Sequence, residues 1–339
     1  MASVVPSDAT ASTSPGPALV TGAAGFVGGR LALRLRERGT QVRALVRPTH
    51  VVPELEAAGV EISRGDAGDR EVVAKASDGC RIVYHLAAAR GRHKLDYRAF
   101  MKENRRISEA VGEGALQAGV ERVVFTSTVS VAGWRRSEPH TESTSVRPNS
   151  AYCASRLQDE QIFREFGGRG LDVVTVRLPQ QIMGPGAYAW ARVARRLAAG
   201  WYRVVPDGGT IQPADVADLI DGMMLCASRP GIAGELFVLG GPSEVSLFEV
   251  LGTLAECLGV PFAPRIVPGA LLRAYVRLGN VAFDLTRLSL PHHFTAEFLS
   301  VARPVDWAKA ERELGFRPRF AMPQSMARTV EWLRDQDLV

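Results

Sequence analysis

The chain has 339 residues, of which 46% are apolar and 23% are charged, as in globular proteins of one large or two closely packed domains. Its net charge of +5 comes mostly from scattered arginines with no long basic run, which argues against a nucleic-acid partner. The four cysteines are far apart and form no C-x-x-C pair, which argues against a zinc site and a disulfide framework. We therefore expect a cytoplasmic protein that holds no metal.

Residues 1–17 are rich in Ser, Thr and Pro and lack the features of targeting signals, so we expect a disordered tail there. The most apolar later stretch, residues 268–290, is interrupted by Arg273, Arg277 and Asp284. Because these charges make it too polar to cross a bilayer, no membrane partner is expected.

From Ala18 onward, short β-branched runs alternate with helical stretches over the first half of the chain. This alternation predicts an α/β fold with a doubly wound, parallel sheet that is covered on both faces. The expected strands cover residues 18–22, 41–47, 61–66, 81–88, 121–130 and 171–179. The expected helices cover residues 26–39, 100–118 and 152–166.

The alternation loosens after Pro179, where glycines and prolines cluster, and resumes with a helix in ADVADLIDGMMLCA and a strand in GELFVLGG. We expect a dinucleotide-binding domain over residues 18–180, rejoined by about residues 211–240. A smaller, mostly helical substrate lobe is expected from residues 181–210 and 241–339.

The sequence TGAAGFVGGR follows the first expected strand and opens the first expected helix, with Gly22, Gly25 and Gly28 spaced as G-x-x-G-x-x-G. Glycines in that place permit a tight turn and let the backbone approach a pyrophosphate at a helix N-terminus. We therefore predict that a dinucleotide binds at this loop. The residues between the glycines belong to the same predicted site: Ala24, Phe26 and Val27.

The second expected strand ends in VRALVRP, which places Arg47 about twenty residues after the loop with no acidic residue beside it. An acid at that position bonds the ribose 2′-hydroxyl of NAD, whereas an arginine accommodates the 2′-phosphate of NADP. Arg47 therefore favours NADP, with NAD as the alternative. The competing interpretation is an ordinary surface arginine at a strand end.

Five motifs occur in a set order, TGAAGFVGG, RGDAGD, YHLAAA, ERVVFTST and a Y-x-x-x-basic pair that begins at Tyr152. With them the chain resembles the extended short-chain dehydrogenase/reductase family, of the NAD-dependent epimerase/dehydratase superfamily. The resemblance continues through GPG, ADVADLI and DWAKAERELGFRP. It implies a Rossmann domain, a smaller C-terminal lobe for a small-molecule substrate and, as is common in the family, a homodimer.

The resemblance also assigns roles to single residues. It implies that Asp66 bonds the adenine amino group and that Pro179 flanks the nicotinamide. It further implies that Thr128 orients a substrate carbonyl and that Tyr152 is the acid/base. The rest of the implied cofactor site comprises Ala67, Leu86, Ala87, Ala88 and Thr126.

The chemistry of hydride transfer also favours this pair. Negative charge develops on the oxygen of a ketone as hydride reaches its carbon, so hydrogen-bond donors must be in place. The pKa of a free tyrosine is about 10, and a cation one helical turn away lies on the same face and favours the phenolate. Tyr152 alone is typical of an ordinary half-buried helix tyrosine, but together with Thr128 it favours catalysis.

In SAYCASRL, the basic residue is Arg156, where the family has lysine. Arginine keeps the charge, but it is a wider planar fork than a compact ammonium and cannot release a proton. We predict that the site binds NADP and transfers hydride more slowly than a lysine version would. Two other interpretations stay open: Arg156 bonds an acidic group of the substrate, or the exchange is neutral.

Sugar-nucleotide enzymes of this family usually have an asparagine after the sixth strand and an arginine before the D-V-A segment. Here the first stretch is RLPQQIMGPG, and no arginine lies between Arg203 and Asp215. The expected lobe also contains aromatic residues that suit an apolar ring: Trp190, Trp201, Tyr202, Phe262 and Tyr275. We favour a dihydroflavonol-reductase- or 3β-hydroxysteroid-dehydrogenase-like enzyme that acts on an apolar cyclic or aromatic ketone or secondary alcohol.

Other functions stay open at this point. An epimerase, isomerase or dehydratase that retains its cofactor, including a nucleotide-sugar enzyme, would borrow and return hydride without net NADPH consumption. A cyclase would use Tyr152 without hydride. A catalytically silent NADP-binding protein would bind cofactor without turnover, although the presence of both Thr128 and Tyr152 argues against it.

Overall fold

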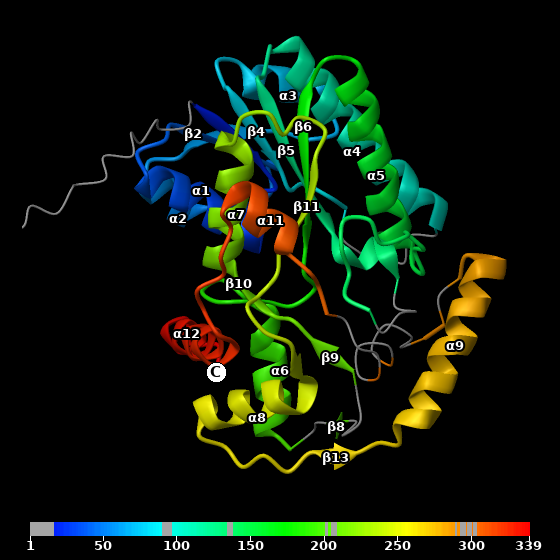
Figure 1. Cartoon of the computed structure of the whole chain (residues 1–339). Helices are drawn as coiled ribbons and strands as arrows, with labels where there is room; N and C mark the ends of the chain where they lie inside the picture. The colour runs from blue at the N-terminus through cyan, green and yellow to red at the C-terminus, as the bar shows by residue number, and fades with distance from the viewer. Residues whose placement is uncertain are drawn as a thin grey trace, which may run out of the picture.

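The computed structural model describes residues 17–89, 97–133, 138–200, 203–204, 209–288, 290–291, 296, 300 and 304–339 (Figure 1). The expected tail lies outside these residues except for its last position, Pro17. Within the described part of the chain, no helix is long and apolar enough to cross a membrane.

A seven-stranded, all-parallel sheet forms the centre of the structure, with the strand order β11-β6-β5-β4-β1-β2-β3. From β1 the chain builds outward to β3, returns to β4 and then builds in the other direction. Such a reversal creates a crevice at the carboxyl ends of the strands, where doubly wound sheets bind ligands. The strands are β1 (Ala18–Thr21), β2 (Val42–Val46), β3 (Glu61–Arg64), β4 (Ile82–His85), β5 (Arg122–Thr128), β6 (Asp172–Leu178) and β11 (Leu236–Val238).

Helices cover both faces of the sheet, and alternate residues of each strand pack on opposite sides. Val20 and Val124 pack on one side with α1 (Phe26–Glu37), α2 (Pro53–Ala57), α7 (Val216–Ser228) and α11 (Ala308–Leu314). Their neighbours Leu19 and Phe125 pack on the other side with α3 (Arg70–Ser77), α4 (Tyr97–Gln117) and α5 (Ala151–Gly168). The strands are therefore continuous apolar runs because both of their faces are buried.

A second apolar core lies below the sheet in Figure 1, where α6, α8 and α12 pack together. Its buried residues include Trp190, Leu251 and Met326. The remaining helices and strands are β7 (Ile182–Met183), α6 (Ala189–Ala198), β8 (Arg203–Val204), β9 (Thr210–Ile211), β10 (Ala214–Asp215), β12 (Val245–Ser246), α8 (Leu247–Leu258), β13 (Arg265–Ile266), α9 (Gly269–Thr286) and α12 (Met322–Asp335).

The expected parallel α/β fold is confirmed, and the differences are local. The strand expected over 121–130 ends at Thr128, because Val129–Ala132 turn into a 3₁₀ helix, η1. The Thr128 hydroxyl accepts a hydrogen bond from the Ser130 N–H at 3.2 Å and so caps that turn. The short helices α2 and α3 were not among the expected elements, although Pro53 and the N-cap Asp69 are ordinary signals for a helix start.

A buried ion pair fixes α5 against the sheet. Glu160 of α5 and Arg177 of β6 form two hydrogen bonds, at 2.9 and 2.7 Å, and their side chains are only 2% and 5% exposed. The Ser127 hydroxyl of β5 donates to the same carboxylate at 2.5 Å. Because a buried charge that loses its partner is costly, this pair ties α5 to both β5 and β6.

We predict that Glu160→Gln lowers the free energy of unfolding by about 3–5 kcal/mol, because it leaves the buried Arg177 cation without its counter-charge. The matched control is Glu121→Gln, which breaks a similarly bidentate pair with Arg81 whose side chains are more than half exposed. Urea unfolding of both variants measures the difference. Equal effects of the two substitutions would contradict the structural role of the buried pair.

Candidate active site

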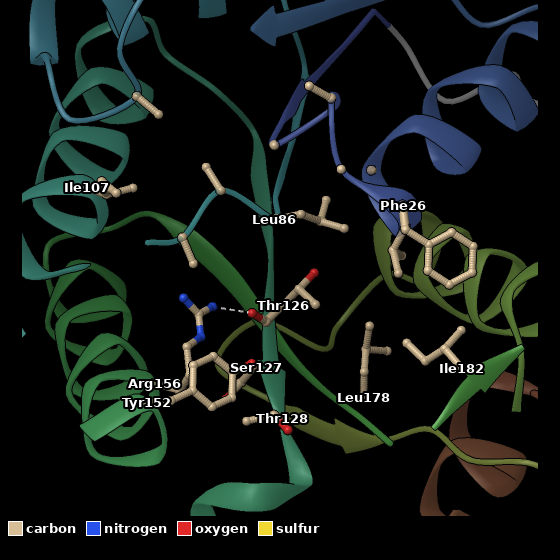
Figure 2. Close-up of a pocket in the computed structure, with 18 of the residues that line it drawn as sticks. Phe26, Leu86, Ile107, Thr126, Ser127, Thr128, Tyr152, Arg156, Leu178 and Ile182 are labelled. Carbon is tan, nitrogen blue, oxygen red and sulfur yellow. Dashed lines mark hydrogen bonds between the residues drawn. The ribbon is translucent and has the colours of Figure 1, made fainter. Parts of the chain in front are cut away.

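A cavity of about 820 Å³ lies at the carboxyl ends of the central strands. The lining comes from the ends of β1 to β6 and from the N-terminal turns of α1 and α5 (Figure 2). All of the residues predicted from the sequence to bind cofactor or to act in catalysis line this one cavity: Gly22, Ala24, Gly25, Phe26, Val27, Gly28, Arg47, Asp66, Ala67, Leu86, Ala87, Ala88, Thr126, Thr128, Tyr152, Arg156 and Pro179.

The glycine loop between β1 and α1 is built for close approach of backbone. Gly22 has φ = 72°, and a Cβ placed on it would lie 2.7 Å from the Ala87 nitrogen. A Cβ on Gly28 would lie 2.4 Å from the Gly22 oxygen. Gly25 is the N-cap of α1 and makes no side-chain cap, so the first amide groups of the helix can serve a ligand phosphate. These features fit a dinucleotide pyrophosphate.

The far end of the cavity is charged and contains the predicted adenosine-binding residues Arg47 and Asp66. Arg47 follows β2 and is exposed, and the His50 N–H donates to the Arg47 carbonyl at 3.0 Å, so both residues lie on one turn that lines the cavity. Asp66 follows β3 and accepts hydrogen bonds from the Gly68 N–H at 3.0 Å and from Arg106 at 2.7 Å. Partial burial alone would raise the pKa of Asp66, but these two bonds and the nearby arginines hold it below its usual value.

Thr128 and Tyr152 meet in another part of the cavity (Figure 2). Thr128 is the last residue of β5, and Tyr152 lies in the first turn of α5, whose N-cap Ser150 accepts a bond from the Cys153 N–H at 3.2 Å. Because the Thr128 hydroxyl accepts its bond from Ser130, its own hydrogen can be donated to a ligand. The side chain of Tyr152 is half-buried, with its ring facing the cavity.

Arg156 lines the cavity, but its guanidinium is held by the protein itself. One nitrogen, Nη1, donates to Asp159 Oδ2 at 2.9 Å, and Nη2 donates to the Thr126 carbonyl, the bond drawn dashed in Figure 2. The guanidinium lies over the Phe125 ring, 4.8 Å from its centre, and the side chain is only 4% exposed. A substrate acid would have to displace one of these bonds, so the interpretation that Arg156 binds such an acid loses support.

Asp159 makes Arg156 one half of a buried ion pair. Its carboxylate is fully buried and also accepts a hydrogen bond from Ser108 of α4 at 2.8 Å. Burial raises the pKa of Asp159 by more than the Arg156 charge and the Ser108 bond lower it. Tyr152 therefore lies one turn from a cation whose field is partly cancelled.

Thr21 and His85 form a buried polar pair below the cavity that no motif in the sequence indicates. The Thr21 hydroxyl accepts a bond from the Ala87 N–H at 3.2 Å and forms a second hydrogen bond with His85 Nδ1 at 2.8 Å. Burial, and next to it the charge of Arg156, lower the pKa of His85 to about 3, so the ring is neutral at physiological pH. The pair supports the backbone at Leu86 and Ala87, where the cavity floor begins.

Other lining residues were not indicated by the motifs: His50, Ile107, Asn149 and Leu290. Leu290, which follows α9, comes from a segment that only the folded chain brings to the cavity. Of the aromatic residues expected to suit an apolar ring, Trp201 and Tyr202 lie outside the described residues. The three that are described lie away from the cavity lining: Trp190, Phe262 and Tyr275.

Comparison with known proteins identifies the family. The profile of the NAD dependent epimerase/dehydratase family matches residues 18–240. The chain belongs to this family. Its structural neighbours are extended short-chain dehydrogenases/reductases, and its relatives include 3β-hydroxysteroid dehydrogenase- and dihydroflavonol-reductase-like proteins, which confirms the resemblance seen in the motifs.

Three similar proteins illustrate the range of activities among the relatives and structural neighbours. The 4-hydroxy-2-methyl-3-oxo-4-farnesyl-3,4-dihydroquinoline-1-oxide ketoreductase of Stigmatella aurantiaca is 29% identical over 91% of this chain and 93% of its own. The 3β-hydroxysteroid dehydrogenase/Δ5→4-isomerase of Mycobacterium tuberculosis H37Rv is 27% identical over 94% of this chain and 90% of its own. The structure of the dTDP-glucose 4,6-dehydratase DesIV of Streptomyces venezuelae, solved with NAD bound, matches with a TM-score of 0.77 and 26% identity. The match covers 94% of this chain and 97% of DesIV.

The family match and the NAD-bound relative support binding of NAD(P) by this chain. The family and its neighbours are NAD(P)-dependent oxidoreductases, epimerases and dehydratases. Among the described residues, no group of three or more His, Cys, Asp or Glu side chains is placed to hold a metal ion.

We predict that Gly22→Ala weakens NADPH binding at least about tenfold, because the new Cβ would push against the backbone of Leu86 and Ala87. Gly119→Ala is the matched control: Gly119 also has a left-handed φ, 67°, but a Cβ there meets nothing within 4 Å. Both variants should lose about 1–2 kcal/mol of stability from the backbone strain. Fluorescence titration with NADPH separates them, and equal affinities would show that the loop does not hold the cofactor.

Proposed function

We propose that the protein is an NADP-dependent ketoreductase or alcohol dehydrogenase that acts on an apolar cyclic or aromatic ketone or secondary alcohol. The observation that carries the proposal is that Thr128 and Tyr152 line the same cavity as the glycine loop of β1 and α1. Two hydroxyl groups therefore lie within reach of a substrate bound beside a dinucleotide. A protein that only binds cofactor has no need of this pair.

The bound nicotinamide would supply or accept the hydride, and the side chains of this chain would manage the substrate oxygen. Thr128 would donate its hydroxyl hydrogen to that oxygen and orient it, while Tyr152 would give or take the proton. Both line a cavity whose wall includes Leu178, Ile182 and Leu290, and out of contact with water a hydrogen bond to a developing charge is stronger than in water.

Arg156 would assist Tyr152 by charge and by position. Its bond to the Thr126 carbonyl connects the helix that carries Tyr152 to the strand that carries Thr128, and its bond to Asp159 within the helix fixes the guanidinium. The same bonds restrict the guanidinium, and Asp159 offsets part of its charge, so hydride transfer should be slower than with a mobile, uncompensated lysine.

NADP as the cofactor is supported by Arg47, because an exposed arginine at the end of β2 stands where NAD-specific proteins carry an acid. An apolar substrate is supported by Leu178, Ile182 and Leu290 in the lining. The ketoreductase and the hydroxysteroid dehydrogenase among the relatives also support an apolar ketone or alcohol as the substrate. The second candidate is a cofactor-retaining dehydratase or epimerase, which the similarity to DesIV favours.

Arg47→Gln is predicted to raise the KM for NADPH about ten- to hundredfold and to leave the KM for NADH nearly unchanged, since only NADPH carries the 2′-phosphate. Arg70→Gln, which removes an exposed arginine of α3 outside the cavity lining, is the control. Steady-state kinetics with both cofactors measure the effect. If the KM for NADH rises as much as that for NADPH, Arg47 does not recognise the 2′-phosphate.

The function itself is tested by following NADPH oxidation with cyclic and aromatic ketones for wild type, Tyr152→Phe and Arg156→Lys. We expect turnover by wild type, about a hundredfold or greater loss in Tyr152→Phe with NADPH binding retained, and faster turnover by Arg156→Lys. An Arg156→Lys protein that binds and turns over no better than wild type would refute the role given to Arg156. If none of the three proteins oxidises NADPH although all of them bind it, the cofactor-retaining or the non-catalytic alternative would be favoured.

A further inference from the structure

Helix α9 exposes a continuous apolar face. Leu271, Leu278 and Leu285 are 70%, 60% and 80% exposed, and their spacing of seven residues places them on one side of the helix. Ala274 and Val281, both exposed, lie between them on the same side. Ordinary surfaces carry single exposed leucines, so a stripe of this length indicates a partner.

The opposite side of α9 packs against the protein, so the helix has a defined orientation. Val276 and Phe283 are buried, and the Phe283 ring contacts the ring of Tyr97, 6.1 Å away between centres. Asn280 is also buried and accepts a bond from Asn149 at 3.2 Å. In Figure 1 the helix stands at the edge of the molecule, apart from α6, α8 and α12.

The surroundings of the apolar stripe are basic. Arg277 is exposed along one side of the stripe, and Arg265, also exposed, precedes the helix. Arg287 follows the helix, but its guanidinium lies over the Phe283 ring, 5.7 Å from its centre, on the other side. The single acidic residue of the helix, Asp284, forms an ion pair with Arg147 at 3.1 Å. An apolar stripe with a positive rim fits a surface that is apolar inside and negative at its edge.

We propose that α9 docks on an anionic lipid surface, with its axis parallel to the membrane plane and its leucines in the interface between headgroups and acyl chains. The stripe from Leu271 to Leu285 is about 21 Å long and one-sided, which fits a helix that lies on a bilayer. Two copies of this face packed together would bring their arginine rims close, which like charges oppose. The proposal departs from the expectation that no membrane takes part.

The docked helix would also deliver substrate, a step that rests on the proposed function. Asn149 lines the cavity and bonds to Asn280 of α9, and Leu290, four residues beyond the helix, lines it too. The segment that contacts lipid is therefore also part of the cavity wall. An apolar ketone dissolved in the membrane would enter beside α9 without crossing water.

The test is co-sedimentation of the full-length protein with vesicles of phosphatidylcholine alone and of phosphatidylcholine with one quarter phosphatidylglycerol. We expect binding at least about tenfold tighter to the anionic vesicles, weakened by high salt. Leu278→Ser combined with Leu285→Ser should abolish it, and Arg277→Gln should reduce it on anionic vesicles. The matched control is Val51→Ser, which removes a side chain that is 80% exposed but far from α9 in sequence.

Equal, weak sedimentation with both kinds of vesicle would overturn the proposal. A concentration-dependent dimer that the double leucine variant abolishes, seen by analytical ultracentrifugation, would assign the face to a second copy instead. NADPH titration of the leucine variants shows whether they are folded, and they should bind NADPH as wild type does. Vesicle binding needs no turnover, so the docking proposal and the proposed oxidoreductase function fail or succeed separately.

Discussion

Two buried ion pairs lie one turn apart under helix α5, and the geometry of the cavity depends on them. Arg156 bonds to Asp159 and to the carbonyl of β5, and Glu160 bonds to Arg177 of β6. If α5 slid along the sheet, Glu160 would lose Arg177 and Arg156 would lose the Thr126 carbonyl without access to water, at a cost of several kcal/mol. The helix is thus locked to the two strands, and Tyr152, in its first turn, is locked with it.

The same network explains how arginine replaces lysine without disrupting the fold. The flat guanidinium reaches two acceptors at once and covers the Phe125 ring, which a lysine ammonium would not do. Asp159 is itself held by Ser108 of α4, so the exchange involves three secondary-structure elements. The site gains rigidity, and the phenol of Tyr152 gains less electrostatic help than a free cation would provide.

The sequence predicts the sheet and the glycine loop well because both depend on local patterns. Apolar runs must form buried strands wherever both faces are covered, and Gly22 belongs to a motif with a fixed place after β1. The partners of Asp66 and Asp159 were not predictable in the same way. Arg106 and Ser108 are about forty and fifty residues away in the chain, and only the packing of α4 beside α3 and α5 brings them close.

The two ends of the cavity differ in how well the sequence predicts them, because one is built from local motifs and the other from loops without a motif. The end that contains Arg47 and Asp66 is formed by consecutive strand ends with recognisable motifs. The other end adds Asn149 and Leu290, which belong to loops without a motif, so the sequence predicts the residues of the first end better than those of the second. A cavity with a charged cofactor end and an apolar end next to an exposed leucine helix favours a substrate that leaves water readily. The same apolar character thus appears on the lining and on the outer surface of one segment, which is what a route from lipid to cavity requires.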